Sequence, residues 1–104
     1  MRNLLLATVV CVVPFAAQAD EMQNAACAGS LTWATQNYLL PDVAYDARNL
    51  FMQRFADDNG ASFVSAFEHV LENMGDIEEL GADLLADTAI DCLDLYAAEF
   101  APNV

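Results

Sequence analysis

Two cysteines near opposite ends of a short chain constrain its fold more than any other feature of the sequence. Cys27 and Cys92 are the pair that remains when Cys11 is removed with a predicted signal peptide. An even number of cysteines in an exported chain indicates a disulfide. In a chain-entropy model this bridge stabilises the folded state by about 4 kcal/mol, a large part of the stability of a small domain. A metal or redox site made from the two thiols is the less favoured alternative, since neither lies in a CxxC motif or near a histidine.

Residues 1–19 have the three parts of a secretory signal peptide. A cationic start precedes an apolar stretch over residues 4–15, and residues 17–19, Ala-Gln-Ala, supply a small-residue cleavage site. The apolar stretch is about a dozen residues long, too short to span a bilayer. We therefore expect a single acidic helical domain over residues 20–104, with no integral membrane segment after cleavage and a periplasmic or secreted location.

Apolar residues in the remainder of the chain recur at helical spacing in four segments, which are separated by the glycines and prolines that stop helices. Alternating runs of β-branched residues, which are typical of strands, are missing from these segments. The predicted helices run from Glu21 to Leu39, from Asp42 to Asn59, from Phe63 (capped by Ser62) to Met74, and from Asp76 (with Glu79 as a capping box) to Tyr96.

The positions of the cysteines agree with a bundle of these four helices. Cys27 lies early in the first predicted helix, on an apolar stripe with Leu31, Ala34 and Tyr38, and Cys92 lies late in the fourth. In an up-down-up-down bundle the first and last helices are antiparallel, so the start of one lies beside the end of the other. We therefore expect an all-α fold: a small four-helix up-down-up-down bundle with one disulfide joining the first and last helices.

The charge balance of the chain is extreme. The chain has sixteen acidic side chains and three basic ones, none of them lysine. Of the basic residues, only Arg48 and Arg54 lie outside the predicted signal peptide. Such a surface repels nucleic acid and anionic lipid, both of which need cationic contacts. A macromolecule that binds this chain through charge is therefore basic. The alternative is that the charge serves solubility alone.

Carboxylates recur along one side of the fourth predicted helix. At 100° per residue, six of them fall within an arc of about 120°: Asp76, Glu79, Asp83, Asp87, Asp91 and Asp94. Like charges four residues apart destabilise a helix, and a basic partner would relieve that repulsion. We assign partner binding to Glu79, Asp83, Asp87, Asp91 and Asp94, with a merely solvated face as the alternative.

Motifs for metal binding or catalysis are weak. The segment 57–60, Asp-Asp-Asn-Gly, resembles the middle of a calcium loop, but its register places Ala66 where a bidentate glutamate is required. His69 and Glu72 supply two metal ligands at most. The serines lie in no recognised nucleophile motif. We expect no metal site, no cofactor and no enzymatic activity.

These features predict a non-enzymatic exported interaction protein that binds a cationic protein partner through an acidic helical face, as inhibitors, immunity proteins and adaptors do. The short exported chain, its helices and its single disulfide resemble the enterobacterial acid-stress chaperones of the HdeA type. This resemblance is one of size and architecture only, and it implies an acid-responsive periplasmic chaperone as an alternative. A small carrier that binds an apolar ligand between its helices is a second alternative.

Overall fold

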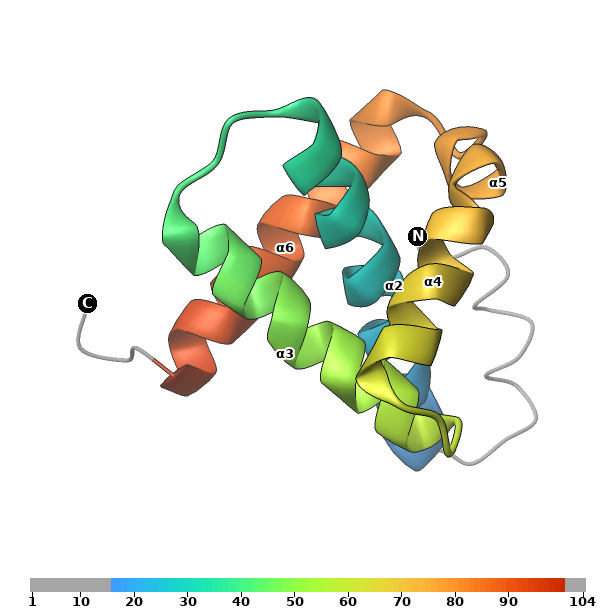
Figure 1. The fold of residues 1–104 in the computed structure, drawn as a ribbon. Coiled ribbons are helices and arrows are strands. Elements are labelled where there is room, and N and C mark those ends of the chain that lie inside the picture. Colours follow the sequence, from blue (N-terminus) through green and yellow to red (C-terminus); the bar gives the residue numbers. More distant parts are fainter. Residues whose placement is uncertain (1–15, 101–104) are drawn as a thin grey trace.

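The computed structural model describes residues 16–100 and, from residue 20 onwards, their side chains. This part of the chain is all-helical (Figure 1). The predicted signal peptide lies outside the described residues, apart from the backbone of its last four residues, which begins the first helix. The five helices are α2 (Ala16–Asn37), α3 (Asp42–Asp58), α4 (Phe63–Glu72), α5 (Met74–Glu78) and α6 (Ala82–Phe100).

Helix α2 lies at the centre of the fold, and the other four helices all pack against it (Figure 1). Every residue from Cys27 to Ala34 is buried, so about two turns of α2 have no exposed side. A helix that is covered all round has to be apolar or small on every side. This stretch meets that demand with alanine, glycine, serine and threonine around the larger Leu31 and Trp33.

The arrangement differs from the predicted four-helix up-down-up-down bundle. The segment expected to form the third and fourth helices contains three helices, α4, α5 and α6. Helix α6 packs against α2 and, to a smaller extent, against α3. The physical reason is the composition of residues 27–34 of α2: a stretch with only apolar or small side chains on every side favours neighbours on all sides, whereas a ring of four helices leaves an outer face of each exposed to water.

The core lies mainly between α2 and α3 and is closed by α4 and α6. Leu31 of α2 and Phe51 and Met52 of α3 are its largest fully buried apolar side chains. Val70 of α4 and Leu85 of α6 cover this layer and are also buried. The disulfide joins α2 to α6, so the predicted link between the first and last helices is confirmed.

Three helices end at an asparagine whose side chain bonds back to the last turn. The Nδ2 atoms of Asn37, Asn59 and Asn73 each donate to the carbonyl oxygen four residues earlier, at 2.8 Å in every case. Such a side-chain hydrogen bond competes with the backbone ladder and favours the end of a helix. At Asn73 this ends α4, and α5 begins at the next residue after a change of direction.

A second break separates α5 from α6 and was also not predicted. Gly81 has a φ of 99°, a backbone conformation that glycine adopts without a steric cost. The predicted capping box does not form, because Asn73 is the N-cap of α5 and Asp76 lies inside its first turn. The fourth predicted helix is therefore two helices, α5 and α6.

The predicted end of the second helix and start of the third are confirmed. Gly60 has a φ of 65°, and the backbone N–H of Ala61 donates to the carbonyl oxygen of Ala56 at 2.9 Å, which is the usual glycine-terminated helix end. The hydroxyl of Ser62 then accepts a hydrogen bond from the backbone N–H of Ser65 at 3.1 Å and caps α4.

Candidate functional site

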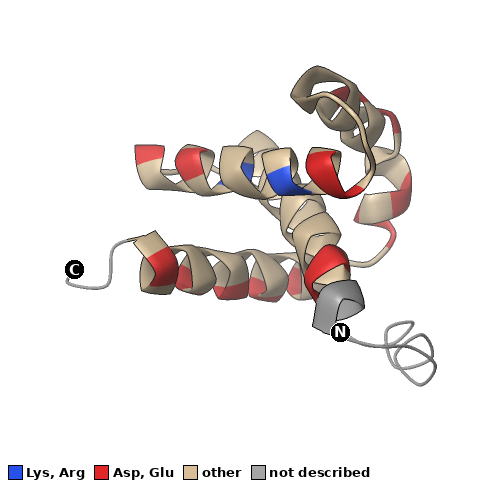
Figure 2. Cartoon of the chain, turned by 90° about the horizontal axis from the view of Figure 1, so that it is seen from below, with Lys and Arg blue, Asp and Glu red and all other residues tan. Residues whose placement is uncertain are grey.

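Four aspartates form an acidic surface along α6, which we call the α6 acidic face: Asp83, Asp87, Asp91 and Asp94. All four are exposed. At 100° and 1.5 Å per residue they fall within an arc of about 80° and span about 17 Å along the helix axis. Figure 2 shows acidic residues recurring turn by turn along α6. The carboxylates therefore form a row on one side of one helix.

Burial on the opposite side of α6 fixes the direction of this row. Leu85, Ala89 and Cys92 are the buried residues of α6 and lie across the helical wheel from the α6 acidic face. Because Cys92 is bonded to Cys27 of α2, the disulfide restricts rotation of the docked α6 about its own axis. The four carboxylates consequently stay directed towards solvent.

Asp76 and Glu79 do not extend the row, contrary to the expectation of one stripe of six carboxylates. Asp76 lies in the first turn of α5 and Glu79 is the C-cap of that helix. Both are exposed. Their spacing from Asp83 matches helical periodicity, but the left-handed backbone at Gly81 changes the direction of the chain between them. The structure therefore brings together four of the five predicted binding residues and leaves Glu79 on another element.

The two arginines of residues 20–100 are engaged away from these four aspartates. The guanidinium of Arg48 lies over the rings of Tyr45 and Phe67, with its central carbon 5.2 and 5.0 Å from the ring centroids. Arg54 forms the one salt bridge within this described stretch, with Glu99 at 3.0 Å. Within the same residues, the α6 acidic face thus has no basic partner in a salt bridge.

Glu99 is the fifth carboxylate of α6, and the sequence pattern does not predict its ion pair. It lies in the last turn of α6 and is bridged to Arg54, which is 45 residues away in the sequence. On a helical wheel Glu99 falls about 80° beyond Asp91, outside the arc of the acidic face. This position on the helical wheel is the sequence feature that distinguishes Glu99 from the α6 acidic face.

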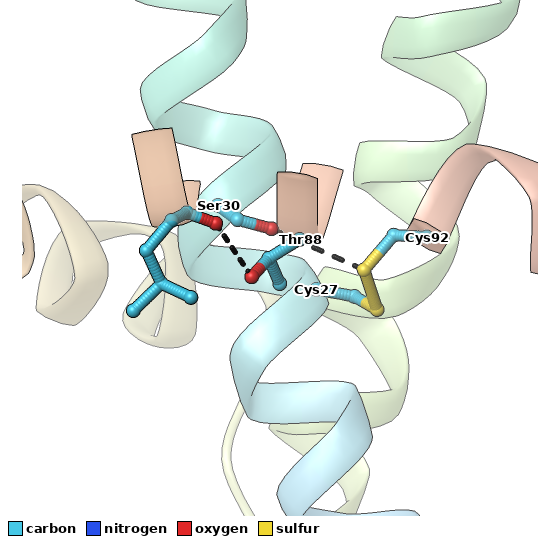
Figure 3. Close-up of a disulfide and its surroundings, with 5 residues drawn as sticks. Cys27, Ser30, Thr88 and Cys92 are labelled. Carbon is cyan, nitrogen blue, oxygen red and sulfur yellow. Dashed lines mark hydrogen bonds between the residues drawn. A yellow bond between two sulfur atoms is a disulfide. The ribbon is translucent and has the colours of Figure 1, made fainter. Parts of the chain in front are cut away.

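The Cys27–Cys92 disulfide lies in the interior between α2 and α6 (Figure 3). Its sulfur atoms are 2.07 Å apart, and the two residues are only 1% and 2% exposed. The hydroxyl of Ser30 lies 3.9 Å from Cys92 Sγ, and the hydroxyl of Thr88 donates to a backbone carbonyl of its own helix (Figure 3). The predicted pairing is confirmed, and both sulfurs are taken up by the bond that links the helices.

A shallow depression of about 220 Å³ lies between the end of α3 and the beginning of α4. The rings of Phe55 and His69 in it are 6.2 Å apart. Its volume is below the roughly 300–1,000 Å³ of most ligand pockets, and its polar side chains are exposed rather than held by buried partners. The residues that line it are Phe55, Asn59, Ala61, Ser65, Ala66 and His69.

The described residues hold no group of three or more histidine, cysteine or acidic side chains that could bind a metal ion. Among the same residues, no helix is both long enough and apolar enough to cross a bilayer. No protein-family model, curated protein or solved structure matches the chain at a significant level.

Proposed function

We propose that this protein is a non-enzymatic, exported interaction protein that binds a cationic protein partner through the α6 acidic face. The observation that carries the proposal is the row of four exposed carboxylates on a helix whose opposite side is fixed to the core by a disulfide. Charges held in place on a rigid helix lose little freedom on binding and therefore favour a partner with matching charges.

The proposed partner is a folded protein with lysine or arginine side chains along a surface of similar length, about 17 Å. Attraction between such surfaces speeds association, and salt screens it because the Debye length falls to about 3 Å at 1 M ionic strength. Nucleic acid and anionic lipid are disfavoured partners, because sixteen carboxylates oppose three basic side chains in the whole chain.

The test removes three charges from the α6 acidic face by the substitutions Asp87→Asn, Asp91→Asn and Asp94→Asn. Asp83 is kept, because it lies in the first turn of α6 and a carboxylate there stabilises the helix. Binding of the oxidised protein to a lysine-rich peptide and to a basic folded protein is measured by calorimetry between about 50 and about 500 mM salt. We expect about a tenfold loss of affinity at the lower salt concentration, from three exposed charge pairs.

A matched control makes the same change in net charge on α3 and α4. Asp46→Asn, Glu68→Gln and Glu72→Gln alter exposed carboxylates that form no salt bridge within residues 20–100. We expect this variant to bind nearly as well as the unaltered protein. Equal loss of affinity in the two triple variants would mean that only net charge attracts the probes, and the proposal would then be wrong. Circular dichroism of both variants checks that the helices remain folded.

A further inference from the structure

We propose that α6 is a separable unit of this fold, and that reduction of the Cys27–Cys92 disulfide by a dithiol undocks and unfolds α6 while α2, α3 and α4 stay folded. This inference does not depend on the proposed function. It rests on how the buried side chains are divided among the helices, on the charge of α6, and on the place of the disulfide between α6 and α2.

The buried contacts divide the molecule unequally. Leu31, Phe51 and Met52, the largest fully buried apolar side chains, all lie in α2 and α3. Helix α6 contributes three buried residues from its nineteen, namely Leu85, Ala89 and Cys92, and one of these is the bridging cysteine. Its other apolar contacts with the core are only partly buried: Ala86, Leu93 and Tyr96. Since α6 contacts mainly α2, its departure would uncover one side of α2 but leave the packing between α2, α3 and α4 in place.

The composition of α6 makes it a weak helix on its own. Its nineteen residues include five acidic side chains and no basic one. Asp83, Asp87 and Asp91 follow one another at intervals of four residues, where like charges repel. Glu99 lies in the last turn, where the helix dipole disfavours a negative charge. Most of the stability of a helix in a protein comes from tertiary packing, so a detached α6 with these repelling charges is expected to unfold.

The noncovalent attachment at the end of α6 is modest. The side chains of Arg54 and Glu99 are 36% and 53% exposed, and exposed ion pairs of this kind contribute little to stability. Arg54 also lies 5.8 Å from the ring centroid of Phe100, itself half exposed. The disulfide is therefore the strongest single link between α6 and the rest of the described chain.

The chemistry of the switch is two successive thiol–disulfide exchanges. A thiolate of the dithiol attacks one protein sulfur, a mixed disulfide forms, and the released cysteine thiolate takes up a proton. The second thiolate of the same reagent then attacks the mixed disulfide, frees the other cysteine and leaves as a cyclic disulfide. The dithiol is oxidised, and the protein gains two electrons and two protons. Because both cysteines are buried, the reagent reaches a sulfur only after α6 has opened.

Hydrogen exchange followed by mass spectrometry tests the proposal on the oxidised protein and on the protein reduced with dithiothreitol. In the reduced protein we expect peptides from residues 82–100 to exchange as unprotected chain, while peptides from residues 42–58 keep their protection. Two results would overturn the proposal: loss of protection in both regions together, which means global unfolding, or retained protection in residues 82–100.

Two further measurements separate local opening from unfolding of the whole chain. The rate of reduction of the oxidised protein should change little at low urea concentrations, since a local opening exposes little surface. If the rate of reduction instead rises with urea concentration as steeply as global unfolding does, the proposal is contradicted. In a Cys27→Ser/Cys92→Ser background, adding Asp87→Asn and Asp91→Asn should restore part of the protection of α6 by relieving repulsion, and adding Glu68→Gln and Glu72→Gln should not. Equal effects of the two pairs would count against the role given to charge.

Discussion

The carboxylate of Glu99 lies 3.0 Å from the guanidinium of Arg54 and ties the last turn of α6 to α3. The same guanidinium lies 5.8 Å from the ring centroids of both Phe51 and Phe100, so one side chain combines an ion pair with two cation–π contacts. The guanidinium of Arg54 thus lies near two aromatic rings while the side chain stays partly in water.

Substitutions at this contact should separate packing from charge. We expect Glu99→Gln to lower the free energy of unfolding by less than about 1 kcal/mol, because the pair is exposed. Arg54→Ala should cost more, since it also removes the packing against the rings. Arg54→Lys should be intermediate, because the ammonium group lacks the flat guanidinium face. Urea denaturation checks the order, and an equal cost for Glu99→Gln and Arg54→Ala would show that the ion pair dominates.

Replacing Thr32 with valine should stabilise the protein. Thr32 is 1% exposed, and its Oγ1 atom has no hydrogen-bond partner within the part of the chain that the structure describes. An unsatisfied buried hydroxyl costs about 1–3 kcal/mol, and valine has nearly the same shape. We expect Thr32→Val to raise the free energy of unfolding by about 1 kcal/mol, seen as a rise of about 4–8 °C in Tm.

Thr35→Val is the matched control for that substitution. The hydroxyl of Thr35 donates to the carbonyl oxygen of Thr32 at 2.9 Å and lies 3.5 Å from a guanidinium nitrogen of Arg48. Because this hydroxyl has partners, its removal should be neutral or destabilising. A gain in Tm equal to that of Thr32→Val would indicate that valine stabilises α2 regardless of hydrogen bonding.

Alanine substitutions at Gly81 and Gly75 should change the stability of the protein in opposite directions. Gly81 has a φ of 99°, which disfavours a residue with a Cβ atom, so Gly81→Ala should cost about 1 kcal/mol. Gly75 lies within α5, and a Cβ atom there would meet no other atom within 4 Å. Gly75→Ala should therefore stabilise by about 0.5–1 kcal/mol through helix propensity. Thermal denaturation of the two variants measures both, and a shift of the same sign would be incompatible with this assignment.

Gly29 lies where α2 contacts α5. The size of the side chain that replaces it should decide whether a substitution raises or lowers the free energy of unfolding. A Cβ atom at Gly29 would lie 3.4 Å from the Cδ1 atom of Ile77, an ordinary contact with the end of a flexible side chain. We expect Gly29→Ala to stabilise by about 0.5 kcal/mol, because alanine favours a helix interior. Gly29→Leu should destabilise by about 1–3 kcal/mol through overpacking. Chemical denaturation checks both, and destabilisation by alanine would show that Ile77 cannot move.

Helix ends that depend on local chemistry could be predicted from the sequence, and the break at Asn73 could not. Pro41, Gly60 and Ser62 act through their own backbone or side chain, and the structure places helix ends at each of them. Asparagine also occurs inside helices, so its back-bond to His69 is one of two local outcomes. Tertiary packing selects between them.

The four aspartates of the α6 acidic face could be predicted from the sequence for a similar reason. Asp83, Asp87, Asp91 and Asp94 share a face wherever the segment is helical, because 3.6 residues per turn place them together. Periodicity alone groups Glu79 with them, although Gly81 separates it from α6. Glycine permits a helix as well as a left-handed turn, so the sequence pattern could not distinguish the two.

The sequence by itself indicated the all-α class and the helix ends next to Pro41, Gly60 and Ser62, because these follow from periodicity and local chemistry. It indicated the pairing of Cys27 with Cys92 because these are the two cysteines outside the predicted signal peptide. Only the tertiary structure decided that residues 27–34 of α2 are buried on all sides, that residues 16–100 form five helices rather than four, and that Tyr38 is 53% exposed although it continues an apolar stripe. Burial depends on which distant segments pack against a residue, and no local pattern in one segment specifies that.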